Sequence, residues 1–253
     1  MDRRDGLVLL SPDDYFRVGE AQFGVPGLIA YEIIGPFVSV DASGPLIMVH
    51  DGRWEPRHGI GHHPHRMNER LFYILEGEVT HDDALNGITG HMGTGDLGCL
   101  TEGMRGMLHK EWNDTDGPAR AFILVYGVDP VPAGAAFSAL READAPRYAP
   151  ADGVETKELV GEKSGFEVRG DIRVFADDVF DPGAALAVDL DPGEGALLYA
   201  HTGGFEVEGR TLGAEDTLLV EPAEAARRLA IGSPLGGRLF RVVHGPGHGL
   251  RVR

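Results

Sequence analysis

Short β-forming runs separated by turn signals recur along the whole chain and constrain its fold more than any other feature. Such runs include "LFYILEGEVTH" (71–81), "AFILVYGV" (121–128) and "RLFRVVHG" (238–245). The 37 glycines and 16 prolines are spread along the 253 residues, as tight turns between short strands require. Sustained 3.6-residue periodicity is rare, and the best helix candidates are short, at 136–143 and 222–229. This pattern predicts an all-β sandwich or barrel.

The two halves of the chain share one rhythm of strands and turns. In the first half "YILEGEV" is followed by "GTGDLGCL", and in the second "YAHTGGFEVEG" is followed by "GAEDTLLVEP". A proline-containing stretch with little β pattern lies between them. We therefore predict a tandem duplication of one β-domain. The expected parts are an N-terminal domain at 1–130, a linker with one short helix at 131–157, and a C-terminal domain at 158–253.

The charge balance narrows the class of partner. The chain has 40 acidic and 23 basic residues, a formal net charge of -17, and few neighbouring basic residues beyond Arg227 and Arg228. Nucleic acids and anionic membranes are normally bound by a basic stripe, so we expect no direct nucleic-acid binding and no membrane binding. The single cysteine, Cys99, excludes an internal disulfide. No run approaches a signal-peptide core or a transmembrane length, which predicts a cytoplasmic protein.

The stretch "GHHPHRMNERLFYILEG" (61–77) carries the strongest chemical signal. Residues at i and i+2 on a strand point to the same face, so His63 and His65 can aim both imidazoles into one cavity. A second such pair, His109 and Glu111, follows a glycine-rich segment. Each pair alone is a weak signal. On facing strands they would supply three imidazoles and one carboxylate, a donor set that suits a divalent first-row metal and favours a metal site over a solvated loop.

The same residues carry a family resemblance. The stretch "HHPHRMNERLFYILEGEVTHDDALNG" (62–87) resembles the pirin signature, and "GTGDLGCLTEGMRGMLHKE" (93–111) is similar to its companion segment. The resemblance is specific over roughly 35–130 and weak over 160–253. Pirins belong to the cupin superfamily, so it implies two jelly-roll β-barrels in tandem, with one metal in the N-terminal barrel. The implied ligands are His63, His65, His109 and Glu111.

The C-terminal half offers no comparable donor set. Its His201 has no H-x-H partner, and His244 and His248 lie four apart in a glycine-rich turn near the chain end. We therefore expect a C-terminal cupin-like domain that lacks a metal site and supports the first barrel.

Glu69 is the alternative carboxylate of the site. It matches the acidic residue that follows H-P-H-R in pirins, where it is not a ligand. It would share a face with His63 and His65 if the strand were regular. The sequence leaves open whether Glu111 or Glu69 completes the metal shell, and Glu69 could instead orient one imidazole. Both are candidate catalytic residues, with Glu111 the expected general base for an enol or phenol proton.

The resemblance also implies a function. Bacterial pirins resemble quercetinases, which cleave a flavonol ring with O₂. We therefore expect a metal-dependent dioxygenase that acts with O₂ on an aromatic or enol-type small molecule. Fe(II) is the first expectation for the metal, with Mn, Ni, Cu, Co or Zn as alternatives.

Two other interpretations stay open. The first is a non-oxidative metal-dependent cupin, an isomerase, cyclase or lyase that uses the ion as a Lewis acid. The second is a non-enzymatic metal-binding regulatory protein, because eukaryotic pirins are associated with transcription-factor complexes. The sequence names no substrate and does not choose between a monomer and a homodimer.

Overall fold

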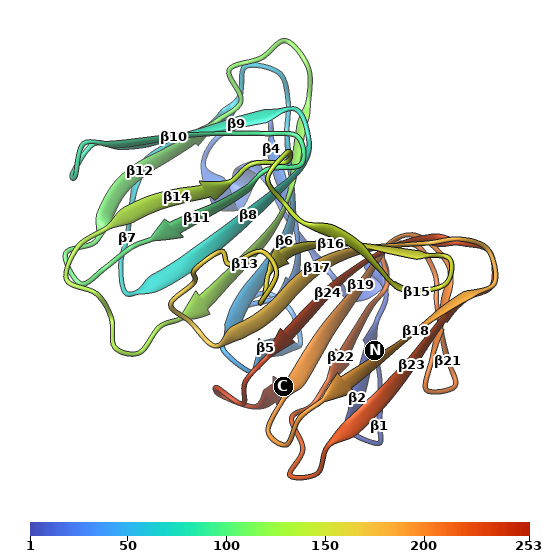
Figure 1. The fold of residues 1–253 in the computed structure, drawn as a ribbon. Helices are drawn as coiled ribbons and strands as arrows, with labels where there is room; N and C mark the ends of the chain where they lie inside the picture. Colours follow the sequence, from blue (N-terminus) through green and yellow to red (C-terminus); the bar gives the residue numbers. More distant parts are fainter. The chain divides into compact units, whose positions relative to one another are not determined.

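Strands make up almost all of the regular structure in the computed structural model, which describes residues 1–253 (Figure 1). The predicted all-β class is therefore confirmed. None of the helices has the length and apolar character needed to cross a membrane. The chain divides into two units. Unit 1 comprises Met1–Tyr15, Ala42–Pro45 and Ala145–Arg253, and unit 2 comprises Phe16–Asp41 and Leu46–Asp144.

Unit 2 is built from two antiparallel sheets around one apolar core. Its elements are β3 (Phe16–Val18), α1 (Glu20–Phe23), β4 (Leu28–Ile34), β6 (Leu46–Trp54), β7 (Gly59–His65), β8 (Asn68–Glu76), β9 (Glu78–Asp83), β10 (Ile88–Gly93), β11 (Leu97–Thr101), β12 (Met107–Trp112), β13 (Ala119–Gly127) and β14 (Ala136–Leu140), with β5 (Val40–Ser43) running into unit 1. The larger sheet has the order β14-β11-β8-β13-β6-β4-β3, and the four-stranded sheet has the order β10-β9-β12-β7. Phe72 and Leu100 from the larger sheet share a core with Val79 and Met107 from the smaller one.

Unit 1 also has a larger sheet and a four-stranded one. Its elements are β1 (Asp2–Arg4), β2 (Leu7–Leu10), the 3₁₀-helix η1 (Pro12–Asp14), β15 (Arg147–Ala151), β16 (Val154–Val160), β17 (Ile172–Phe180), β18 (Ala184–Leu190), β19 (Gly195–Gly203), β20 (Phe205–Val207), β21 (Arg210–Leu212), β22 (Thr217–Val220), β23 (Arg227–Ser233), β24 (Gly237–His244) and β25 (Leu250–Val252). The larger sheet has the order β1-β2-β22-β19-β24-β17-β16-β15, and the smaller one the order β18-β23-β20-β21.

The strand order is repeated between the units. The run β11-β8-β13-β6 in unit 2 corresponds to β22-β19-β24-β17 in unit 1, and the order β10-β9-β12-β7 corresponds to β21-β20-β23-β18. Eight consecutive strands of each unit, β6 to β13 and β17 to β24, are thus connected and paired in the same way. This repeated topology is what the predicted tandem duplication requires.

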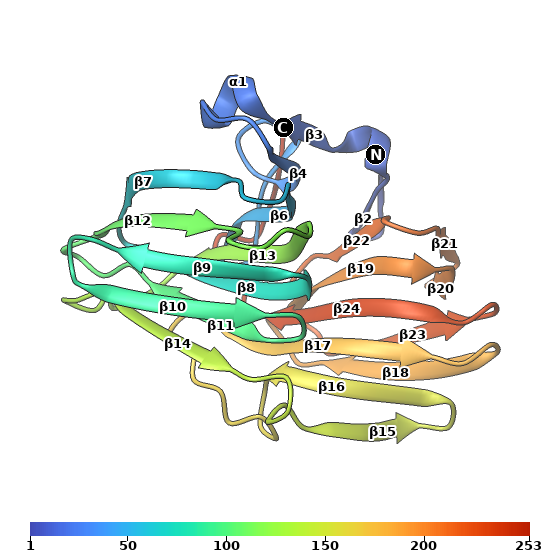
Figure 2. The ribbon, with the colours of Figure 1, turned by 90° about the horizontal axis from the view of Figure 1, so that it is seen from above.

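The unit boundaries differ from the predicted domain boundaries because of two long-range pairings. Residues 1–15 belong to unit 1 rather than to a domain at 1–130, since β2 pairs with β22. Residues 131–144 belong to unit 2 rather than to a linker at 131–157, since β14 pairs with β11 (Figure 2). Such pairings join segments that are far apart in the sequence, and a pass along the chain does not detect them.

Both predicted helices are wrong. Residues 136–140 form β14, in which Phe137 is half-buried against the core and Leu140 is buried, and a strand replaces the helix expected in the linker. The segment has the alanines of a good helix former, but pairing with β11 overrides this weak preference. Residues 222–226 form no helix, and β23 begins at Arg227.

Candidate metal centre

Three histidines converge in the four-stranded sheet of unit 2. His63 and His65 lie at the end of β7, and His109 lies opposite His63 on the neighbouring strand β12. One ring nitrogen from each lies within 4.8 Å of the others. The ring centroids are 4.7 Å apart for His63 and His65, and 4.5 Å apart for His63 and His109. The structure thus brings together the three histidines that the i, i+2 spacing singled out.

Glu111 lies beside this cluster on β12. A bulge in the β7–β12 pairing separates it from His109, and its Oε1 lies 3.6 Å from His109 Nδ1. The side chain is buried, and Oε1 has no hydrogen-bond partner. Burial raises the pKa of Glu111 to about 7, against a lowering influence from Arg70. The desolvation of this buried carboxyl group therefore outweighs the influence of the positive charge on Arg70.

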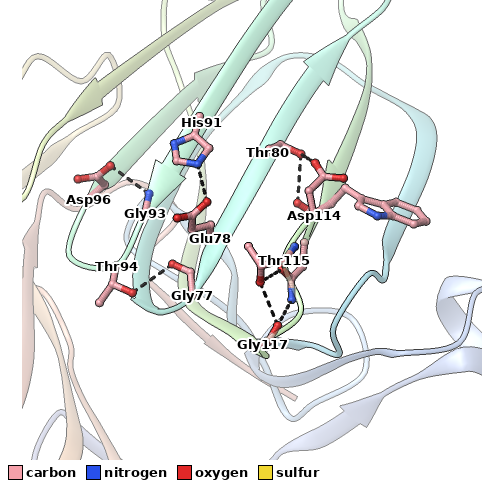
Figure 3. Close-up of polar contacts among 12 residues, drawn as sticks. Gly77, Glu78, Thr80, His91, Gly93, Thr94, Asp96, Asp114, Thr115 and Gly117 are labelled. Carbon is pink, nitrogen blue, oxygen red and sulfur yellow. Dashed lines mark hydrogen bonds and ion pairs between the residues drawn. The ribbon is translucent and has the colours of Figure 1, made fainter.

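Polar contacts of Thr80, Asp114, Thr115 and Gly117 lie where β12, which carries His109 and Glu111, runs into the next loop (Figure 3). Thr80 Oγ1 on β9 lies 3.1 Å from the carbonyl oxygen of Trp112 and 2.8 Å from Asp114 Oδ2. In the loop that follows, Thr115 Oγ1 donates a hydrogen bond to the carbonyl of Gly117 at 3.1 Å. The Thr80 contacts tie the end of β12 to β9, and the Thr115 contact closes the loop that follows.

Burial keeps the imidazoles of the cluster neutral. Desolvation lowers the pKa of His63, lowers that of His65 to about 3, and lowers that of His109 further. His63 Nδ1 donates to the carbonyl of Gly61 at 2.8 Å, which leaves its Nε2 with a lone pair. Neutral imidazole is the form that binds a metal ion.

Three buried atoms without hydrogen-bond partners indicate which kind of ligand the site fits. His109 Nε2, His81 Nε2 and Glu111 Oε1 are buried without a hydrogen-bond partner. Most buried polar atoms in proteins are paired, so these three unpaired atoms need an explanation. Imidazole nitrogen and carboxylate oxygen are donors that divalent first-row metals accept. The donor set therefore fits a divalent transition metal.

Glu69 does not join the cluster. Its carboxylate is buried on β8, where Oε1 accepts a hydrogen bond from Thr101 Oγ1 at 2.6 Å and Oε2 accepts one from Tyr126 at 2.9 Å. The premise that placed it on the face of the histidines is wrong. The chain turns between β7 and β8 at Met67, whose φ is 81°, so no regular strand runs from His63 to Glu69.

His81 is a member of the site that sequence reasoning missed. It lies on β9 opposite Glu111, and its Nδ1 is 3.2 Å from His109 Nδ1. Burial lowers the pKa of His81 to about 4. Its ring stacks on Phe137 with centroids 5.7 Å apart. The signal was present, because His81 lies inside the stretch that resembles the pirin signature, but spacing alone gave no reason to pair it with His109.

Arg70 is the second residue that sequence reasoning missed. From β8, its Nη2 donates to His65 Nδ1 at 2.7 Å and its Nε donates to Glu102 Oε1 at 2.7 Å. Glu102 is fully buried and also accepts the backbone N–H of Asn68. A guanidinium therefore lies at the edge of the cluster, fixed there by a buried ion pair.

The cluster opens onto a cavity of about 270 Å³ between the sheets of unit 2. Its walls are mostly apolar and include Phe23, Trp54 and Phe72. The polar and charged side chains that line it are Gln22, Glu32, His50, His63, His65, Arg70 and Glu111. An apolar pocket with a few convergent polar groups is the usual form of a small-molecule site.

Comparison with known proteins finds a matching family profile and relatives that carry the same family name. The family profile described as Pirin matches residues 20–124. A pirin-like protein of Caulobacter vibrioides is 31% identical over 212 residues, which cover 74% of this chain and 73% of that protein. Pirin-like protein 2 of Arabidopsis thaliana is 28% identical over 191 residues, or 66% of this chain. The chain spans only 56% of the length of that plant relative.

Solved structures share the fold at low identity. The nickel(II) complex of a bacterial pirin from Escherichia coli superposes with a TM-score of 0.76 and 15% identity, covering 95% of this chain and 99% of the other. A quercetin 2,3-dioxygenase from Acinetobacter baumannii gives a TM-score of 0.77 and 20% identity, covering 92% and 83%. Sequence identities this low support a shared fold only, and the chemistry has to be argued from the residues of the site.

Proposed function

The chain belongs to the pirin family, and from that premise we propose that it is a metal-dependent dioxygenase acting with O₂ on an aromatic or enol-type small molecule. Its fold is the all-β pair of tandem cupin barrels implied by the resemblance. One observation carries the proposal. A cluster of three neutral histidines, with the buried and unpartnered Glu111 beside it, opens onto an apolar cavity.

The proposed ligands of the ion are His63, His65, His109 and Glu111. When bound, a divalent transition metal polarises a chelating substrate oxygen and supplies a centre for O₂ chemistry. We propose Fe(II) first, because reaction with O₂ favours a redox-active ion. Nickel stays among the candidates, since the relative from Escherichia coli was solved with nickel(II), as do Mn, Cu, Co and Zn.

The chain's own side chains have three tasks in this proposal. Phe72, Ile123 and Val125 line the cavity and would hold an aromatic ring away from water. Glu111 Oε1 has no hydrogen-bond partner in the protein and would accept the proton of an enol or phenol. Arg70 lines the cavity beside His65 and would favour an anionic oxygen on the substrate.

Oxygen consumption with flavonols tests the proposal. Metal-reconstituted protein is incubated with quercetin and with simpler hydroxyflavones in an oxygen electrode, beside metal-stripped protein and a His63→Ala/His109→Ala variant. We expect oxygen uptake and substrate loss that depend on the metal and disappear in the variant. Equal turnover by metal-free protein would contradict the proposal. Turnover that persists under argon would identify a non-oxidative isomerase, cyclase or lyase instead, and no turnover of any enol substrate would favour a regulatory role.

A further inference from the structure

A second polar pair lines the same cavity. Glu32 on β4 and His50 on β6 face each other as partners in the sheet, and His50 Nε2 lies 3.1 Å from Glu32 Oε2. Glu32 is 1% exposed and His50 is 9% exposed. Burial of titratable groups is costly unless they are hydrogen-bonded, as these two are to each other, and neither is a proposed metal ligand.

The backbone is shaped around the Glu32 carboxylate. Oε1 accepts the backbone N–H of Phe37 at 2.7 Å, while Oε2 faces His50. Gly35 has φ of 150°, and a Cβ at this position would lie 2.5 Å from the carboxyl carbon of Glu32. Only glycine leaves room for the carboxylate here, so the position of Glu32 is built into the loop that follows β4.

The pair leaves one nitrogen of His50 available. A carboxylate oxygen accepts hydrogen bonds, so in the imidazole form of the ring the proton lies on Nε2, which donates to Glu32 Oε2. Nδ1 then carries a lone pair, and no protein group bonds to it in the structure. A carboxylate that orients an imidazole and fixes its tautomer leaves the other ring nitrogen as a directed acceptor.

The Glu32–His50 pair lies across the sheet from the end of the cavity that is lined by His63, His65 and Arg70. His50 is in register with Ile123, and Ile123 is in register with Phe72, so these three side chains form one row across β6, β13 and β8. Arg70 lies two residues from Phe72 on β8 and faces the same side. Two strand spacings separate β6 from β8, or about 10 Å. An occupant that reaches both ends would lie over Ile123 and Phe72.

We propose that the Glu32–His50 pair is a second recognition point for the substrate, at which His50 Nδ1 accepts a hydrogen bond from a hydroxyl group. The inference rests on the proposed function and narrows its substrate class to aromatic compounds with oxygen functions at both ends. One end carries the enol or phenol oxygens that face His63, His65 and Arg70. The other end carries the hydroxyl group that faces His50. Glu32 is a positioning residue that acts through His50.

Two flavonols test this assignment. Both 3-hydroxyflavone and 3,4′-dihydroxyflavone carry the same chelating 3-hydroxy-4-ketone, and only the second has a hydroxyl at the far end. Each is titrated into zinc-loaded protein and followed by absorbance and fluorescence. We expect the dihydroxy compound to bind about three- to tenfold more tightly, as one hydrogen bond provides. His50→Phe should remove this preference and leave the affinity for 3-hydroxyflavone within about twofold. Glu32→Gln should reduce the preference in the same selective way.

The outcomes separate this inference from the proposed function. Equal affinity of the wild-type protein for the two flavonols would overturn the inference alone, because chelation through the shared group needs only the metal end. Binding of neither flavonol to metal-loaded protein would overturn both. A His50→Phe variant that keeps the preference would also overturn the inference. If that variant does not fold, the ¹⁵N resonance of His50 Nδ1 in zinc-loaded wild-type protein should shift with the dihydroxy compound only, and an unchanged resonance would count against the assignment.

Discussion

His109 Nδ1 lies 3.2 Å from His81 Nδ1, so the two rings share one hydrogen bond in the interior of unit 2. The contact engages the same nitrogen of His109 that lies 3.6 Å from Glu111, and it leaves Nε2 as the atom without a partner. His81 is in turn held by its stack on Phe137. The orientation of a proposed metal ligand is therefore set by a residue that need not bind the metal itself.

Replacement of His81 should weaken metal binding even though the four proposed ligands remain. His81→Phe preserves an aromatic ring against Phe137 but removes the hydrogen bond to His109. We expect the affinity for Ni(II) or Co(II) to fall about 10- to 100-fold, as measured by competition with a chelator. His62→Ala is the matched control, because His62 lies on β7 but is partly exposed and pairs with Asp82. Unchanged affinity in His81→Phe would show that His109 needs no such support.

Glu111 and Glu69 should respond differently to the loss of charge. Glu111→Gln removes the buried carboxylate beside His109 and should lower metal affinity. Glu69→Gln should leave metal affinity unchanged and instead destabilise the fold, because both oxygens of Glu69 accept hydrogen bonds inside the larger sheet. Isothermal titration with metal and urea unfolding of the two variants measure the two effects. A Glu69→Gln variant that lost the metal would reverse the assignment.

The ion pair between Arg70 and Glu102 should contribute strongly to stability. Glu102→Leu keeps a side chain of similar size but leaves the Arg70 guanidinium buried without its carboxylate. Removal of one member of a buried pair typically costs about 3–5 kcal/mol. Urea unfolding should show a loss of this order. Asp189→Asn, which breaks the exposed pair with Arg228, should change the unfolding free energy little, and equal losses in the two variants would contradict the argument.

Stability of unit 1 should depend on pH through His244. Burial lowers the pKa of His244 below its ordinary value of 6.5, and its Nδ1 donates to the carbonyl of Gly245. Below pH 6.5 the unfolded chain takes up a proton that folded His244 resists. The stability that His244 contributes is thus fully present above this pH and is lost as pH falls toward the folded pKa. Unfolding of wild type and His244→Phe at pH 8 and pH 5 should show a wild-type advantage that shrinks on acidification. A constant difference would exclude this role.

Local spacing predicted which three histidines lie together. His63 and His65 are two apart on one strand, and His109 faces them from the next, so the alternation of side chains in strands was sufficient to group them. The same rule failed for Glu69, because it assumed a regular strand through Met67, where the chain turns.

Long-range pairing accounts for most of what the sequence did not reveal. His81 reaches His109 only because β9 pairs with β12, and Glu32 meets His50 only because β4 pairs with β6. The alanines around residue 136 favour a helix locally, yet pairing with β11 makes this segment a strand. The all-β class was predictable because every strand carries its own signal, whereas the choice of partner strand is a property of the whole fold.

Elemental analysis of purified protein tests the central claim most directly. Wild-type protein and a His63→Ala/His109→Ala variant are prepared side by side, reconstituted with divalent transition metals, and freed of excess metal. We expect near-stoichiometric metal in the wild type and its loss in the variant, because two of the three clustered imidazoles are gone. No metal in the wild type after reconstitution, or equal metal in both proteins, would contradict the assignment of the cluster as a metal centre.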